Sequence, residues 1–155
     1  MRARHLSKFA PRARQRGFTL LEVGLAVVVS MLVIAAAAMA FTTQRAKASV
    51  KSAVEGVNYI YQASQDWAST RPNFTGVSCA ALVAQNLLPQ VLGSCTGTNP
   101  WGGNYTVAVN GSNSARVDIT LTNVPTGPGA QMVDKLTPFA TATPSYTSGT
   151  FTVTF

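Results

Sequence analysis

The sequence has few residues suited to catalysis. It contains one histidine, His5, and only five acidic residues, spread along the chain at Glu22, Glu55, Asp66, Asp118 and Asp134. Serine and threonine are abundant, but no histidine follows position 5 and no glycine-rich phosphate-binding loop is present. We therefore expect a protein that is not an enzyme, binds no metal and carries no cofactor.

Cysteine is also scarce. Cys79 and Cys95 are the only two, and both lie in the part of the chain that we expect outside the cytoplasm. In an oxidising compartment such a pair predicts a disulfide. The bond would close a loop of roughly 15 residues and contribute about 3 kcal/mol in the chain-entropy model. The alternative is a pair of free, buried thiols.

The positive charge is confined to one end of the chain. The net charge is +7, with 12 lysines and arginines. Half of these precede Phe18, at Arg2, Arg4, Lys8, Arg12, Arg14 and Arg16. From Phe18 onward the basic and acidic side chains nearly balance. Nucleic acid is therefore not an expected direct partner of the domain that follows.

A long apolar run follows the basic segment. From Phe18 to Phe41 the sequence has one charged residue, Glu22, and no proline. This run exceeds the roughly 20 residues that cross a bilayer as a helix. The basic flank predicts that the N-terminus stays in the cytoplasm and that the C-terminal part faces outward. We therefore expect residues 18–41 to be a membrane-spanning helix.

The apolar pattern changes after residue 41 but does not stop. Between residues 42 and 71, apolar positions recur every three or four residues, as on an amphipathic helix. The predicted stripe is Val50, Val54, Val57, Ile60 or Tyr61, Ser64, and Trp67 or Ala68. Pro72 disfavours helix at Arg71, so one continuous helix is predicted from about residue 18 to residue 70.

The remainder, residues 72–155, predicts a small globular region. A short helix is expected from Cys79 to Leu88, before Pro89, and Asn99–Gly103 is a strong turn signal. Strands are expected at 105–109, 115–121 and 151–155, with a short helix near 131–136 after a break rich in proline and glycine. Each strand has one apolar face. The predicted fold class is α+β, with the long helix packed under a small antiparallel sheet.

The stretch RQRGFTLLEVG, residues 14–24, joins the basic segment to the apolar helix. It resembles the class III signal of type IV prepilins and of the related type II secretion pseudopilins, and its long leader favours the type IVb group. The resemblance implies that a prepilin peptidase removes residues 1–17 by cutting between Gly17 and Phe18, and that the new Phe18 amine is methylated. The alternative is that Gly17 is only a loop residue before a membrane helix.

The resemblance also implies a role for Glu22. In such proteins this carboxylate pairs with the Phe18 amine of a neighbouring subunit during filament growth. A lone carboxylate in hydrocarbon is costly, so a partner of this kind is physically reasonable. The alternative is a glutamate that extends to the membrane edge.

By resemblance, the protein polymerises with itself through its N-terminal helix, in a pilus used for adhesion, motility, or DNA or conjugative transfer. The implied partners are the prepilin peptidase, an inner-membrane platform protein, an assembly ATPase and a secretin. The precursor would lie in the bacterial inner membrane and the subunit later in an extracellular pilus. Two alternatives are a type II secretion pseudopilin and a secreted protein cut after Ala38-Met39-Ala40.

Overall fold

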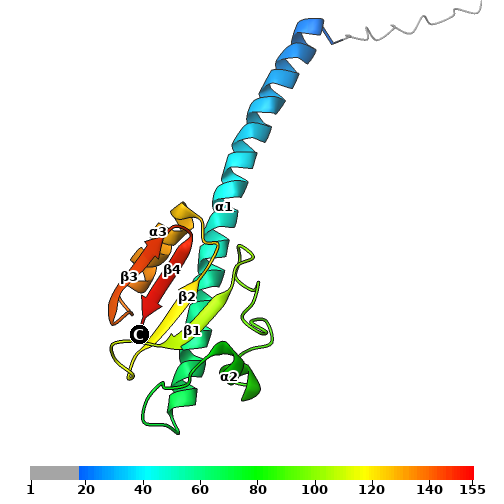
Figure 1. Cartoon of the computed structure of the whole chain (residues 1–155). Helices are drawn as coiled ribbons and strands as arrows, with labels where there is room; N and C mark the ends of the chain where they lie inside the picture. Colours follow the sequence, from blue (N-terminus) through cyan, green and yellow to red (C-terminus); the bar gives the residue numbers. More distant parts are fainter. Residues whose placement is uncertain (1–17) are drawn as a thin grey trace, which may run out of the picture. The chain divides into compact units, whose positions relative to one another are not determined.

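The computed structural model describes residues 18–155 (Figure 1). The predicted leader, residues 1–17, lies outside the described residues, and so does Gly17. The described residues form two compact units, one ending at Ala40 and one from Phe41 to Phe155. Helix α1, Leu20–Ala68, contributes residues to both.

In the first unit, α1 begins with a side-chain cap. Thr19 precedes the helix, and its hydroxyl oxygen accepts a hydrogen bond from the backbone N–H of Glu22 at 3.2 Å. This bond satisfies one of the N–H groups that the first turn leaves without an intrahelical partner. The cap explains why the helix starts at Leu20, two residues later than predicted.

In the second unit, α1 buries one face against the sheet. The predicted stripe is largely confirmed, because Val50, Val57, Ile60, Ser64 and Trp67 are buried. Val54 and Tyr61, by contrast, are only half-buried. Three small residues that the pattern did not select complete the buried face: Ala53, Gly56 and Ala63. The helix ends at Ala68, close to the predicted end.

The sheet has four antiparallel strands in the order β1-β2-β4-β3. They are β1 Tyr105–Val109, β2 Val117–Leu121, β3 Ala142–Thr147 and β4 Thr150–Thr154. In β2 and β4 buried residues alternate with half-buried or exposed ones, and the buried set includes Val117, Ile119, Phe151 and Val153. Figure 1 shows the sheet beside the second half of α1, which confirms the α+β prediction.

The sequence predicted three strands, and this number was wrong because β3 was missed. Strand β3 is an edge strand with only one buried position, Pro144, so it lacks the alternating apolar pattern. Proline has no N–H to donate and is tolerated at a sheet edge. The pairing of β3 with β4 also shifts register between Ala142 and Ser145, which further limits edge pairing with other chains.

Both short helices differ from their predicted bounds. Helix α2 spans Cys79–Ala84 and ends earlier than predicted, because the chain turns through Asn86 in a left-handed conformation, with φ 54°. Helix α3 spans Thr126–Leu136 and starts earlier than predicted. Its first turn contains Pro128, a position where the missing N–H removes no intrahelical bond. The proline- and glycine-rich break is therefore the start of a helix.

Candidate functional site

Glu22 lies in the first turn of α1, and its side chain is exposed. Thr19 and Glu22 have the spacing of a capping box, a local signal carried by the sequence TLLE. The N-terminal end of a helix favours a carboxylate, but only by about 0.3–1 kcal/mol. Among residues 18–155 the one ion pair is Lys51–Glu55, so the described chain supplies no cation to Glu22.

The helix around Glu22 exposes its apolar side chains in every direction. All residues from Phe18 to Arg45 are exposed, and Leu20 is 92% exposed. This helix contains a window with a mean hydropathy of 2.6, so it is long and apolar enough to cross a membrane. Monomeric soluble proteins rarely expose an apolar surface of this size. The segment therefore requires lipid or protein around it.

Ser30 lies on the same helix face as Glu22, two turns further along. The two residues line one shallow groove together with Phe18, Ala26 and Ile34. The Ser30 hydroxyl donates a hydrogen bond to the backbone oxygen of Ala26 at 2.7 Å, so it is satisfied within the helix. Ser30 therefore offers Glu22 no partner of opposite charge. Glu22 is the single charged residue in the apolar segment Phe18–Phe41.

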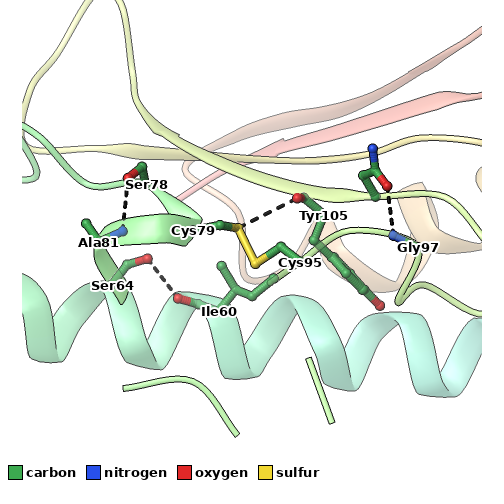
Figure 2. Close-up of a disulfide and its surroundings, with 9 residues drawn as sticks. Ile60, Ser64, Ser78, Cys79, Ala81, Cys95, Gly97 and Tyr105 are labelled. Atoms are coloured by element: carbon green, nitrogen blue, oxygen red, sulfur yellow. Dashed lines mark hydrogen bonds between the residues drawn. A yellow bond between two sulfur atoms is a disulfide. The ribbon is translucent and has the colours of Figure 1, made fainter. Parts of the chain in front are cut away.

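The two cysteines form a disulfide that joins the start of α2 to the loop before β1. Figure 2 shows it above the part of α1 that carries Ile60 and Ser64. Cys79 Sγ lies 3.6 Å from the backbone oxygen of Tyr105, the first residue of β1. The Ser78 hydroxyl caps α2 by accepting a bond from Ala81 N at 3.2 Å. The disulfide therefore fastens the irregular segment between α1 and β1 to the core.

Replacing Cys79 and Cys95 together with alanine is expected to destabilise the fold by about 3 kcal/mol, because the unfolded chain gains the entropy of an open loop. The bridge spans 16 residues of sequence. The measurement is urea unfolding of the full-length chain in detergent, followed by tryptophan fluorescence. Reduction of the native protein should lower its midpoint by a similar amount. Equal midpoints for the oxidised, reduced and alanine forms would contradict the prediction.

The turn Asn99–Gly103 is held by one buried side chain. Asn99 is 4% exposed, and its amide nitrogen donates to the backbone oxygen of Thr122 at 2.7 Å. Its amide oxygen accepts bonds from the backbone N–H groups of Trp101 at 2.9 Å and Gly103 at 2.8 Å. Asn99 therefore ties the loop before β1 to the end of β2. The sequence predicted the turn but not this role, which depends on Thr122.

Tyr105 packs across α1 at Gly56. A Cβ atom at Gly56 would overlap the Tyr105 hydroxyl oxygen, so the close approach requires glycine. Tyr105 is 4% exposed. Burial penalises the charged phenolate and raises the pKa of Tyr105 from 10.0 to about 12.

This pKa shift predicts that stability falls in alkali. Below pH 10 the phenol is protonated in both states, and Tyr105 adds no pH dependence. Above pH 10 the unfolded chain loses the proton first, which favours unfolding, by about 1.4 kcal/mol at pH 11. The measurement compares urea unfolding at pH 9 and pH 11 for the native chain and Tyr105→Phe. The variant should lose less stability over this interval, and an equal loss would contradict the assignment.

The acidic residues of the globular unit do not converge. Asp118 accepts hydrogen bonds from the side chains of Asn110 and Thr154, including two bonds of 3.0 Å from the Asn110 amide. Asp134 lies on α3 and is exposed. Within residues 18–155, no group of three His, Cys, Asp or Glu residues is placed to hold a metal ion.

The fold and the apolar helix define a class of protein. A long N-terminal helix, apolar in its first half and packed against a small antiparallel sheet in its second, is the architecture of the type IV pilin-like and pseudopilin subunits. These families consist of structural subunits rather than enzymes.

Comparison with family models agrees with this class. The model for the prokaryotic N-terminal methylation motif matches residues 12–38. The model described as PilS N terminal matches residues 45–141, which is more than half of the chain. The chain belongs to this PilS N-terminal family. The comparisons with curated proteins and with solved structures gave no significant match.

Proposed function

We propose that the protein is a structural subunit of a type IV pilus that polymerises through the apolar half of α1. The observation that carries the proposal is the exposed apolar segment with a lone carboxylate in its first turn. Outside a membrane, an isolated monomer would expose this apolar surface to water, which soluble monomers rarely do. In a filament, copies of the same segment would cover one another. The prepilin-type motif and the family match support this role.

The proposed maturation begins with the removal of residues 1–17. A prepilin peptidase cuts between Gly17 and Phe18, and the Phe18 amine is then methylated. Residues 18–41 first anchor the precursor in the inner membrane and later form the filament core. Residues 42–71 and 72–155 form the outer, globular part. The long leader leaves the type IVb group as the favoured subclass.

Glu22 is the proposed assembly residue. Cleavage creates a positive amine on Phe18, four residues before Glu22 in the sequence, and methylation keeps that amine charged. Pairing between Glu22 of one subunit and Phe18 of its neighbour would neutralise both charges in an apolar environment. Leaving either charge alone in such an environment is strongly unfavourable. The platform protein, the ATPase and the secretin are the proposed assembly partners.

Mass spectrometry of the mature N-terminus tests the processing step. A methylated Phe18 is the expected result. A mature chain that begins at Phe41 would indicate an ordinary signal peptide cut after Ala38-Met39-Ala40 and would overturn the proposal. Electron microscopy of cells with and without the gene tests assembly. Surface filaments that disappear on deletion are expected.

A type II secretion pseudopilin is the second candidate, because the methylation motif and the apolar helix are common to both kinds of subunit. The two candidates predict different losses on deletion. A pilin mutant should lose surface filaments and keep protein export, whereas a pseudopilin mutant should retain its substrates in the periplasm. Measuring both in the same deletion strain separates the two roles.

A further inference from the structure

The part of α1 that directly follows the apolar run carries three basic side chains. Arg45, Lys47 and Lys51 are all exposed, and no acidic residue occurs between Glu22 and Glu55. The buried face of this part of the helix begins at Val50 and continues through Ala53, so the cations lie outside it. We call these three residues the basic collar.

Arg45 connects the collar to the end of the apolar run. Its guanidinium carbon lies 4.3 Å from the centroid of the Phe41 ring, one helical turn earlier. Phe41 is 56% exposed, so the aromatic face and the cation form a joint surface. An apolar ring beside a cation is suited to the boundary between hydrocarbon and water, where long basic side chains extend toward the headgroups.

The collar is mostly free of acidic partners within the protein. In the described part of the chain the only ion pair joins Lys51 Nζ to Glu55 Oε1 at 3.8 Å, and both side chains are largely exposed. Arg45 and Lys47 have no carboxylate within ion-pairing distance among residues 18–155. Two of the three cations are therefore available to an external anion.

We propose that the basic collar binds the phosphate groups of anionic phospholipids at the outer surface of the membrane that holds the precursor. This inference rests on the proposed membrane-anchored stage. Charge complementarity supports a lipid partner, because the cations follow at once on the segment expected to end at the headgroups. Bound there, the collar fixes how deep the apolar helix lies before the subunit enters a filament.

The test is lysine reactivity in liposomes. The full-length chain is reconstituted into vesicles of phosphatidylcholine, with or without phosphatidylglycerol, and recovered by flotation. A membrane-impermeant acetylating reagent is added, and modification of each lysine is followed by mass spectrometry. Lys135, exposed on α3 and on the same side of the membrane as the collar, is the internal reference for orientation.

Anionic vesicles are expected to slow acetylation of Lys47 and Lys51 about fivefold relative to Lys135, the factor that corresponds to about 1 kcal/mol per basic residue at such a surface. Neutral vesicles should show no such protection, and high salt should remove it. Glu55→Gln should increase the protection of Lys51, because it removes the competing carboxylate. Asp66→Asn, an exposed acid further along the same helix, is the matched control and should change nothing.

Three results would overturn the inference. Equal lysine reactivity in neutral and anionic vesicles, with normal flotation, would rule out phospholipid binding by the basic collar. The membrane-anchored stage would not be affected by that result. Lysines that react freely in vesicles but are protected in isolated filaments would assign the collar to contacts with neighbouring subunits. Failure of the chain to float with vesicles would remove the anchored stage itself, and the proposed function with it.

Discussion

Glu22→Ala and Glu22→Leu are expected to abolish filaments while the leader is still removed and Phe18 still methylated. Both variants would leave the Phe18 amine of the neighbouring subunit charged and unpaired in the filament core. Removing one partner of a buried ion pair costs about 3–5 kcal/mol, which weakens each subunit contact on the order of a hundredfold or more. Filament yield by electron microscopy and N-terminal mass spectrometry are the two measurements.

The matched control is Glu55→Ala. Glu55 is the next acid along α1 and is exposed, and its pair with Lys51 is worth only about 0.3–0.5 kcal/mol. This variant should form filaments in normal yield. Glu22→Gln separates charge from shape, because it keeps the size of the side chain and should still prevent assembly. Normal filaments from the glutamine or leucine variant would instead favour a glutamate that merely extends to the membrane edge.

Gly103→Ala is expected to destabilise the globular unit by about 2–6 kcal/mol. A Cβ atom at this position would overlap the backbone oxygen of Thr122 and lie 2.7 Å from Asn99 Nδ2. These are the two atoms of the hydrogen bond that ties the loop to β2. The cost combines overpacking, about 1–3 kcal/mol, with a buried polar group left unsatisfied, about another 1–3 kcal/mol. Urea unfolding of the full-length chain in detergent measures it.

The neighbouring glycine supplies a matched control. Gly102 has a φ of +74° and open space where a Cβ would lie, so Gly102→Ala tests backbone conformation alone. Its expected cost is about 1–2 kcal/mol. Gly103 has no such φ, so Gly103→Ala tests space alone. Equal losses for the two variants would mean that the hydrogen bonds of Asn99 do not set the stability of this turn.

Local patterns in the sequence were sufficient for the helix and for much of the sheet. The run from Phe18 to Phe41, the stripe through Val57 and the alternation at Val117–Leu121 follow from periods of 3.6 and 2 residues, which depend only on near neighbours in the chain. The signal around Glu22 is equally local. The assignments of Gly17 and Phe18 to cleavage, and of Glu22 to assembly, remain predictions.

Features that depend on contacts between distant segments could not be predicted from the sequence. Strand β3 is a strand because it pairs with β4, although Pro144 and Ser145 disfavour that assignment locally. Position 56 requires a glycine because the Tyr105 ring packs directly against it, and these two residues are far apart in the chain. Asn99 holds its turn by reaching the end of β2. None of these three partners could be named before the chain was folded.

The sequence by itself determined where the apolar helix lies, where its single carboxylate lies, and which half of the helix packs under a sheet. Tertiary structure decided how the irregular segment between α1 and β1 is held, through the disulfide, Asn99 and the contact of Tyr105 with Gly56. The physical reason is the range of each interaction. Helix periodicity and membrane transfer act on neighbouring residues, whereas close packing and buried hydrogen bonds exist only between surfaces that folding brings together.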